Sequence, residues 1–249
     1  MVLIEPSLRI RTGIAGLDPL IQGGLQQGDF VLLVGGIGTG KTICSCQFVY
    51  NAAKLDNENS VFATFEEDVN SLKKNMLRFG MDLGALEKEG KIKLMDMEAL
   101  EGGGMGANIE TLLGALDDVK GKRLVVDSLT AFMSGAQEKF DYSFLMHLIY
   151  KTLKREGITT LMTASTPQGL SFMQNNKQGA ERNASQVYSL TDLGLEEFIA
   201  DGLFQLENYV SEHMELKTRF IIRKLRGTEH SRKYHNVAFT PNGIEIYKW

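Results

Sequence analysis

Apolar and polar positions alternate in blocks along the first two thirds of the chain, and each block has the period of a strand or of a helix. Apolar runs at residues 30–34, 60–65, 123–127 and 158–164 have the length and composition of buried strands. The segments between them place apolar residues three or four positions apart, which predicts helices. Buried strands that alternate with helices indicate an α/β fold with a mostly parallel sheet.

The last third of the chain is richer in strand patterns. Residues 199–206, 216–226 and 237–247 are predicted to be antiparallel strands. Two loops are expected, a flexible one in the glycine-rich residues 101–106 and a mobile one in residues 165–189, which are rich in Gln, Asn and Ser. The sequence shows no linker and no internal repeat. We therefore expect residues 5–249 to form one domain, with helices on its parallel sheet and an antiparallel extension at the C-terminus.

The first predicted strand leads directly into a phosphate-binding pattern. Residues 35–42 have the P-loop spacing Gly-x-x-x-x-Gly-Lys-Thr. Its glycines let backbone N–H groups point at phosphate oxygens, and a helix that begins near Lys41 directs its positive end at the same anion. Lys41 is expected to reach the β- and γ-phosphates, and the Thr42 hydroxyl to bind Mg²⁺. The residues assigned to nucleotide binding are Gly35, Gly38, Thr39, Gly40, Lys41, Thr42 and Ile43.

Carboxylates follow two of the other predicted strands. Asp127 ends an apolar strand, which is the position of a Walker-B aspartate that holds Mg²⁺. Glu66 and Glu67 end the strand after the P-loop helix, where a carboxylate can polarise the water that attacks the γ-phosphate. Acidic residues are also common in the first turn of a solvated helix. The pattern alone leaves both interpretations of the two glutamates open.

Basic residues gather near the end of the chain. Residues 217–233 contain seven of them, namely Lys217, Arg219, Arg223, Lys224, Arg226, Arg232 and Lys233. Lys224 and Arg226 are two apart in a predicted strand, so both side chains point to one face. A solvated cationic face on an edge strand is the simplest interpretation. The basic cluster also fits a protein that acts on DNA.

In combination, these motifs resemble the KaiC-type ATPases of the RecA superfamily. The resemblance rests on residues 12–18 (Thr-Gly-Ile-x-Gly-Leu-Asp), 23–25 (Gly-Gly-Leu), the P-loop, 64–67 (Thr-Phe-Glu-Glu), 78–80 (Arg-Phe-Gly), 127–128 (Asp-Ser) and 224–230 (Lys-Leu-Arg-Gly-Thr-Glu-His). It implies a RecA-like core, ATP with Mg²⁺, and hexameric rings. It assigns Glu66 and Glu67 to water activation. It also implies contacts with the ATP of the neighbouring subunit from Lys224, Leu225, Arg226, Thr228 and His230.

Other positions qualify the resemblance. Arg78 falls in a region that packs near adenine in this family, and a guanidinium can stack on a base; a solvated helical arginine is the alternative. Ser165 and Thr166 stand where the family often has a longer polar side chain. Residues 196–199 (Glu-Glu-Phe-Ile) occupy the region where the self-phosphorylating domain of KaiC has adjacent Ser and Thr, so we expect no autokinase activity near Glu197. KaiC has two such domains in tandem, whereas this sequence has one.

Composition and net charge indicate which kinds of partner the protein is expected to bind. The chain is 43% hydrophobic and 23% charged, which is ordinary for a globular protein, and its net charge of −4 does not favour nucleic acid. We find no secretory or membrane-spanning stretch, and expect a cytoplasmic protein without a membrane partner. Cys44 and Cys46 are two apart on a predicted helix and point to different faces, so neither a disulfide nor a metal pair is expected.

These observations predict a Mg²⁺-dependent ATPase that forms a homo-hexameric ring and acts as a regulatory or signalling switch on an unidentified protein partner. The main alternative is a RecA- or RadA-like ATPase that acts on DNA, a recombinase paralogue or translocase. It is suggested by the predicted loop at 165–189, which contains Lys177 and Arg182. A third hypothesis is a scaffold that binds ATP but hardly hydrolyses it. The intact set of P-loop and carboxylate residues argues against this one.

Overall fold

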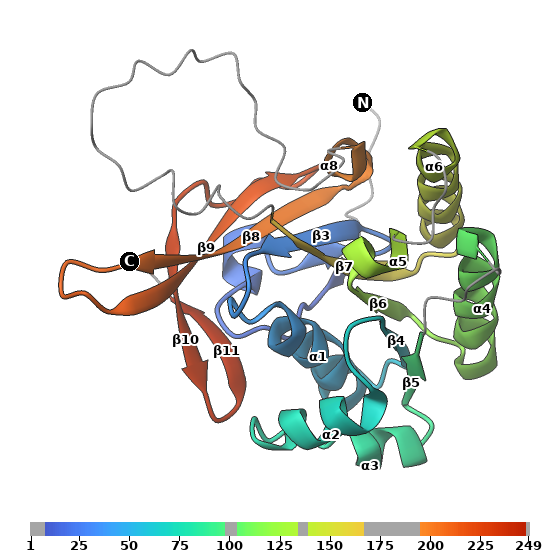
Figure 1. The fold of residues 1–249 in the computed structure, drawn as a ribbon, viewed down its shortest axis with the longest axis horizontal. Coiled ribbons are helices and arrows are strands. Elements are labelled where there is room, and N and C mark those ends of the chain that lie inside the picture. The colour runs from blue at the N-terminus through green and yellow to red at the C-terminus, as the bar shows by residue number, and fades with distance from the viewer. Residues whose placement is uncertain (1–7, 98–103, 134–138, 167–194, 248–249) are drawn as a thin grey trace.

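The chain forms a nine-stranded sheet with helices on both faces (Figure 1). The computed structural model describes residues 8–97, 104–133, 139–166 and 195–247. The strand order is β11-β10-β9-β8-β3-β7-β6-β4-β5. A separate two-stranded sheet joins β1 (Arg9–Ile10) to β2 (Leu25–Gln26), with the short helix η1 (Asp18–Ile21) between them. In these described ranges, no helix is both long enough and apolar enough to cross a membrane.

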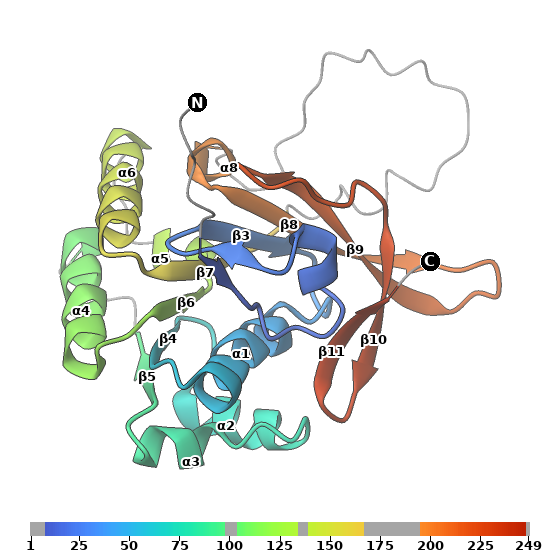
Figure 2. The ribbon, with the colours of Figure 1, turned by 180° about the vertical axis from the view of Figure 1, so that it is seen from behind.

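The predicted parallel sheet is confirmed. The strands β3 (Phe30–Gly35), β4 (Ser60–Thr64), β5 (Ile92–Asp96), β6 (Arg123–Asp127), β7 (Thr159–Ser165) and β8 (Gly202–Val210) are parallel. The antiparallel extension is β9 (Leu216–Leu225), β10 (His235–Thr240) and β11 (Gly243–Tyr247). The β8–β9 hairpin extends beyond the body of the molecule (Figure 1, Figure 2).

The side chains of β3 alternate between two hydrophobic cores. Val31 and Leu33 pack in the core that contains the helices α1 (Lys41–Asn51), α2 (Val69–Leu77) and α3 (Leu83–Lys88). Phe30, Leu32 and Val34 pack in the core on the other face, with α4 (Gly104–Val119), α5 (Leu129–Met133) and α6 (Lys139–Arg155). A strand buried on both faces explains why the sequence there is continuously apolar. The fold therefore has three layers, with β3 in the middle one.

Three sequence predictions are wrong in detail. Residues 237–247 form a hairpin and not one strand, because Pro241 has no N–H for a ladder and Thr240 closes a turn by donating to the Gly243 carbonyl at 3.0 Å. The expected strand at 199–206 begins only at Gly202, after the helix α8 (Leu195–Ile199); it pairs antiparallel with β9, as predicted, but parallel with β3. Gly104 and Gly106 belong to α4 and not to a loop. The predicted mobile loop, with Lys177 and Arg182, falls almost entirely outside the described residues.

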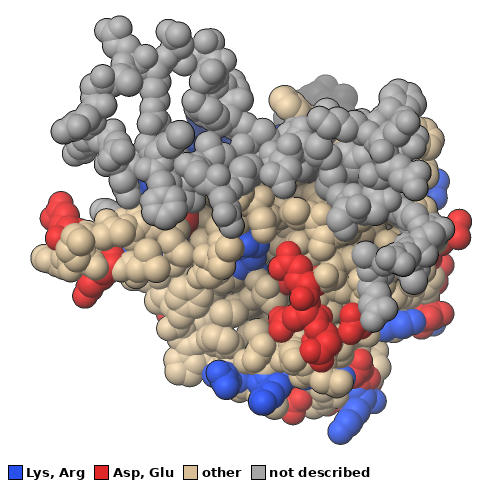
Figure 3. Space-filling model, in the orientation of Figure 1, with Lys and Arg blue, Asp and Glu red and all other residues tan. Residues whose placement is uncertain are grey.

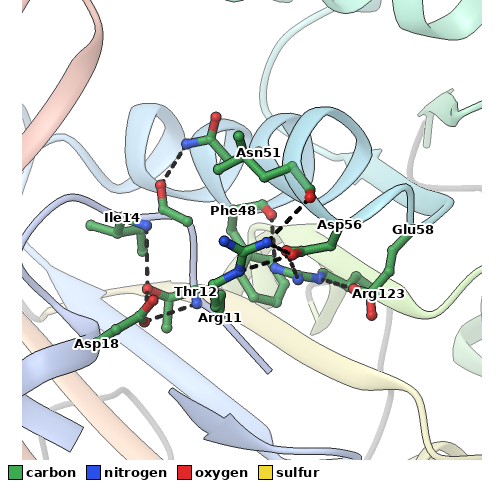
Figure 4. Close-up of polar contacts among 11 residues, drawn as sticks. Arg11, Thr12, Ile14, Asp18, Phe48, Asn51, Asp56, Glu58 and Arg123 are labelled. Atoms are coloured by element: carbon green, nitrogen blue, oxygen red, sulfur yellow. Dashed lines mark hydrogen bonds and ion pairs between the residues drawn. The ribbon is translucent and has the colours of Figure 1, made fainter. Parts of the chain in front are cut away.

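A buried arginine connects the end of α1 to the start of β6 (Figure 4). Arg123 has only 1% of its side chain exposed, and it pairs with Glu58 at 2.7 Å and with Asp56 at 3.2 Å. It also donates to the Phe48 carbonyl at 3.2 Å, and its guanidinium lies 4.8 Å from the centre of the Phe48 ring. Asp56, which ends the π-helix η2 (Ala52–Asp56), also accepts from Arg11. These contacts join the P-loop helix to the strand that ends at Asp127.

Candidate active site

The P-loop connects β3 to α1, as the sequence predicts. Gly40 precedes the first residue of α1 with a φ of 92°, a conformation that favours glycine. A Cβ atom there would lie 2.7 Å from the ring of Phe239 and 2.8 Å from Ile244. Both residues come from the β10–β11 hairpin, which lies beside α1 (Figure 1, Figure 2). Glycine is therefore required at this position by the backbone and by the hairpin packed against it.

The side chains of the loop bond to its own backbone. Lys41 Nζ donates to the carbonyl oxygens of Gly35 at 2.9 Å and Gly36 at 3.1 Å, and the buried Thr39 hydroxyl donates to Gly36 at 2.9 Å. Burial lowers the pKa of Lys41, while the negative charges of Asp127 and Glu66 oppose this shift. The ammonium group thus lies inside the loop and close to carboxylates. Ile43 follows in the first turn of α1 and is half-buried.

Asp127 lies in the middle of the sheet edge that carries the P-loop. β6 is between β4 and β7, so Asp127 is opposite Thr64 on one side and beside Thr163 on the other. The Thr163 hydroxyl donates to Asp127 Oδ1. Burial raises the pKa of Asp127, whereas hydrogen bonds from Thr163 and Thr42 oppose this shift. The hydroxyl and the carboxylate that were predicted to hold Mg²⁺ are therefore in contact.

These two oxygen ligands fit Mg²⁺. Mg²⁺ prefers oxygen ligands and is usually held by one or two carboxylates together with phosphate and water. The Asp127 carboxylate is only 3% exposed, so a cation beside it would relieve the burial of its charge. Among the described residues, no group of three or more His, Cys, Asp or Glu residues is arranged for a metal ion. Bound nucleotide and water would have to supply the remaining ligands.

The two glutamates lie in the turn after β4, and neighbouring side chains hold each of them. The Thr64 hydroxyl accepts from the N–H of Glu67 at 3.2 Å and donates to its carbonyl at 2.8 Å, which fixes the turn. Glu66 Oε1 accepts from the Ser128 hydroxyl at 2.5 Å, and Glu67 Oε2 accepts from the Asn75 amide at 3.2 Å. Because Ser128 follows Asp127 directly, Glu66 is linked to the end of the same strand that carries the predicted metal ligand.

The electrostatic environment of Glu67 suits a general base. Burial raises the pKa of Glu67, the hydrogen bond from Asn75 opposes this, and the charges of Asp127, Asp68 and Glu66 raise it further. Figure 3 shows acidic side chains gathered in a strip on the face seen in Figure 1. A carboxylate with a raised pKa accepts a proton more readily from water.

The predicted basic pair shares one face and contacts the end of α8. Lys224 Nζ donates to the carbonyls of Glu197 at 2.9 Å and Phe198 at 3.2 Å. Arg226 donates to Phe198 at 2.6 Å and Ile199 at 3.2 Å. Burial lowers the pKa of Lys224, and the neighbouring charge of Arg226 lowers it further. Both cations are therefore held by backbone carbonyls of their own chain.

The other residues predicted to contact the neighbouring subunit's ATP are Leu225, Thr228 and His230, and they lie beside Lys224 and Arg226. Leu225 is buried at the end of β9, and Thr228 is 7% exposed, with its hydroxyl accepting from Arg9 at 2.8 Å. His230 Nδ1 is 3.1 Å from the Thr228 carbonyl. Lys224, Arg226 and His230 line a hollow of about 480 Å³ together with Arg223 and Arg232.

The basic group and the P-loop lie at different ends of β3. The P-loop follows Gly35, the last residue of this strand. Arg226 donates its backbone N–H to Asp201, which in turn bonds to Phe30, the first residue of the strand. Five residues at a strand rise of about 3.3 Å separate the two ends by about 17 Å. One chain therefore does not bring Arg226 to its own P-loop.

Arg78 is exposed and lies just after α2. A Cβ atom on Gly80, two residues later, would lie 3.5 Å from the Pro241 carbonyl in the β10–β11 turn. The chain just after Arg78 therefore approaches the hairpin that packs against Gly40.

Several residues that shape this site were not assigned roles from the sequence. Thr163 bonds to Asp127, Ser128 bonds to Glu66, and Asn75 bonds to Glu67. Phe239 of the hairpin occupies the space that a side chain at Gly40 would need. Ser128 follows Asp127 directly, so adjacency was an available signal. The roles of Thr163 and Phe239 depend on strand register and on hairpin packing, which the linear pattern does not contain.

Comparisons with known proteins agree on one family. A family model described as the KaiC ATPase matches residues 10–249. The circadian clock oscillator protein KaiC of Synechococcus elongatus is 31% identical over 250 residues, which cover 96% of this chain and 44% of that protein. A UPF0273 protein of Thermotoga maritima is 31% identical over 246 residues, which cover 96% of both chains.

A solved structure agrees with the fold. The crystal structure of a KaiC-like protein from the hyperthermophilic archaeon Pyrococcus horikoshii OT3 matches with a TM-score of 0.81 and 33% identity, and the match covers 97% of this chain and 100% of that one. This chain thus spans less than half of the KaiC protein that it matches. It spans nearly all of the UPF0273 protein and of the KaiC-like structure.

Proposed function

This chain belongs to the KaiC family of ATPases and is an ATP-binding P-loop ATPase, and from that premise we propose that it hydrolyses ATP with Mg²⁺ between the subunits of a homo-hexameric ring. Residues 5–249 act as one ATPase domain. The ring changes state with hydrolysis and serves as a regulatory switch for a protein partner. The observation that carries the proposal is the convergence of Lys41, Thr42, Asp127, Glu66 and Glu67 at one edge of the sheet.

Each residue at this edge has a proposed role. The backbone of residues 35–42 and the Lys41 ammonium bind the phosphates, after Lys41 exchanges its P-loop carbonyls for phosphate oxygens. Thr42 and Asp127 hold Mg²⁺, which when bound neutralises charge on the phosphates. Glu67 accepts the proton of the attacking water, and Glu66, held by Ser128, orients that water. Arg78 stacks on the base.

A second copy of the chain supplies the remaining cations. Charge develops on the γ-phosphoryl oxygens during transfer, and a cation supplied by a neighbouring subunit is a recurrent way to stabilise it. Lys224 and Arg226 form a basic surface at the start of β3, and the length of this strand, about 17 Å, separates them from their own P-loop. This separation supports a role in trans. A head-to-tail contact between this surface and the acidic P-loop edge of the next copy repeats around a closed ring. The family resemblance suggests six members.

Mixing two inactive variants tests the arrangement. Lys41→Ala removes the P-loop cation, and Lys224→Ala/Arg226→Ala removes the trans pair. Each variant is expected to be inactive alone. An equal mixture should regain about a quarter of wild-type ATPase activity, because one interface in four then pairs an intact P-loop with an intact basic surface.

Two controls make the mixing result specific. Lys217→Ala/Lys233→Ala removes two positive charges from exposed sites outside the hollow and should leave ATPase activity near the wild-type value. A fluorescently labelled subunit should show that copies exchange during mixing. Exchange without regained activity would refute the trans arrangement, as would an active monomer. Stimulation of the ATPase by single-stranded DNA would instead favour the DNA-acting alternative.

The proposed switch does not phosphorylate itself near α8. Glu197 and Phe198 have no hydroxyl group to accept a phosphoryl group. Incubation with γ-labelled ATP followed by peptide mapping should find no label on the peptide that contains residues 195–200. Label on this peptide would contradict the proposal.

A further inference from the structure

We propose that Asp201 is a positioning residue, which holds Arg226 in the orientation that the neighbouring subunit's nucleotide requires. This inference rests on the proposed trans role of Arg226. It concerns residues 198–201, which are the end of α8 and the two residues before β8, and which contact the Arg226 guanidinium. Figure 1 shows α8 beside the start of β8 and the end of β9.

Among the described residues, the polar contacts of Arg226 come from residues 198–201. Arg226 Nη2 donates to the Phe198 carbonyl at 2.6 Å, and Nη1 donates to the Ile199 carbonyl at 3.2 Å. The Asp201 carboxylate lies 3.8 Å from Nη1, and the Asp201 carbonyl accepts the backbone N–H of Arg226 at 2.8 Å. Asp201 thus fixes Arg226 through both its main chain and its charge.

These contacts leave donors for a ligand. A guanidinium has five N–H groups in a rigid plane, and the two carbonyl bonds use one on each terminal nitrogen. The side chain of Arg226 remains half exposed. Residues 198–201 therefore orient the plane while its other N–H groups stay available to phosphate oxygens.

Asp201 is itself firmly held. Its side chain is 4% exposed. Oδ2 accepts from Lys154 at 2.7 Å and from the Phe30 N–H at 3.2 Å, and Oδ1 accepts from the Tyr150 hydroxyl at 3.1 Å. These partners come from α6 and from the start of β3, two elements of the packed core. A carboxylate fixed by the core can hold a half-exposed arginine in one orientation, whereas a solvated carboxylate would move with it.

The bond to Phe30 offers a competing explanation, because β3 leads to the P-loop. If Asp201 acts through β3, its loss impairs the P-loop of its own subunit. If it acts through Arg226, its loss impairs the site on the next subunit. The two explanations predict opposite results in a mixing experiment.

The test uses Asp201→Asn in the full-length protein. Asparagine keeps the size and one acceptor oxygen but removes the negative charge beside Arg226. The ATPase kcat of the variant alone should fall between about tenfold and a hundredfold, the range expected when a reacting group is displaced. KM for ATP should change little. Asp29→Asn, at a buried carboxylate that makes no contact with Arg226 in the described structure, is the matched control and should keep wild-type kcat.

Mixing then assigns Asp201 to one side of the interface. Mixed with Lys41→Ala, Asp201→Asn should regain as much activity as the Lys224→Ala/Arg226→Ala variant does. Mixed with Lys224→Ala/Arg226→Ala, it should regain none. The reverse pattern, or wild-type kcat in Asp201→Asn alone, would overturn the inference.

The same experiments distinguish failure of the trans arrangement from failure of the role of Asp201 alone. If Lys41→Ala and Lys224→Ala/Arg226→Ala fail to complement each other, the trans arrangement is wrong and this inference falls with it. If they complement but Asp201→Asn does not respond to Lys41→Ala, only the role of Asp201 is wrong. Should Asp201→Asn fail to fold, Asp201→Glu moves the charge by one methylene and should give the same mixing pattern. A different pattern would overturn the inference.

Discussion

Replacing Arg123 by alanine should destabilise the protein more than any exposed charge substitution. The guanidinium is buried, and it pairs with Asp56 and Glu58 while lying over the ring of Phe48. Its removal leaves two carboxylates without their shared cation and opens a cavity beside Phe48. The contact that joins the P-loop helix to β6 is lost at the same time.

The size of the stability loss in Arg123→Ala depends on how exposed Asp56 and Glu58 are. Breaking a buried ion pair by removing one partner costs about 3–5 kcal/mol. Asp56 and Glu58 keep 19% and 24% of their side chains exposed, so water partly solvates them afterwards. We therefore expect a loss of about 3 kcal/mol in the free energy of unfolding, the lower end of that range. For a chain of this size it corresponds to about 6–12 °C in Tm.

Urea denaturation followed by far-UV circular dichroism measures the effect. The experiment is done without nucleotide and at one protein concentration, because ligand and association both add apparent stability. Arg155→Ala is the matched control, since Arg155 is 75% exposed and pairs with the adjacent Glu156. The control should change stability by less than about 0.5 kcal/mol. Equal effects for Arg123→Ala and Arg155→Ala would refute the reasoning.

Three further results are expected. Glu67→Gln should keep nucleotide affinity but lower kcat about a hundredfold or more, because it removes the proton acceptor and not a phosphate contact; an equal loss of affinity, measured by titration, would count against this role. Asn75→Ala removes a hydrogen bond that lowers the pKa of Glu67, so the acid limb of the kcat profile should move to higher pH, and an unmoved limb would show that Glu67 is not the base. Burial raises the pKa of Asp29 to about 6, so the protein should lose stability as pH rises from about 4 through 6, while Asp29→Asn, which stays neutral, should not; parallel stability curves for the two proteins would contradict this shift.

The sequence predicts the fold and the candidate site best where both depend on residues that are close together in the chain. The P-loop spacing, the strand before it and the helix after it lie within about twenty residues, so local rules locate them. Asp127 and the two glutamates could be selected as candidates because parallel strands end at a common edge and each carboxylate follows an apolar run. The helix that begins at Lys41 and the parallel sheet are confirmed.

The rest depends on contacts between residues far apart in sequence. An apolar alternation carries no strand direction, so β8 could not be recognised as parallel to β3. The bond from Thr163 to Asp127 follows from the register of β6 and β7, and the contact of Asp201 with Arg226 follows from a bulged pairing of β8 with β9. Pro241 within the predicted strand was a signal for the hairpin, and reading it would have corrected that prediction.

The packing of the β10–β11 hairpin on the P-loop has a consequence for the order of events during synthesis. Gln47 in α1 accepts from the N–H of Ile244 at 2.8 Å and donates to its carbonyl at 3.1 Å, across a sequence separation of 197 residues. The ribosome releases β3 and α1 early, but the hairpin that supports Gly40 emerges only after almost two hundred further residues. A nascent chain halted before residue 235 therefore has the whole nucleotide-binding sequence without the surface that shapes it. The structure around Gly40 is therefore completed by a contact between distant parts of the chain, and not by the local sequence of β3 and α1 alone.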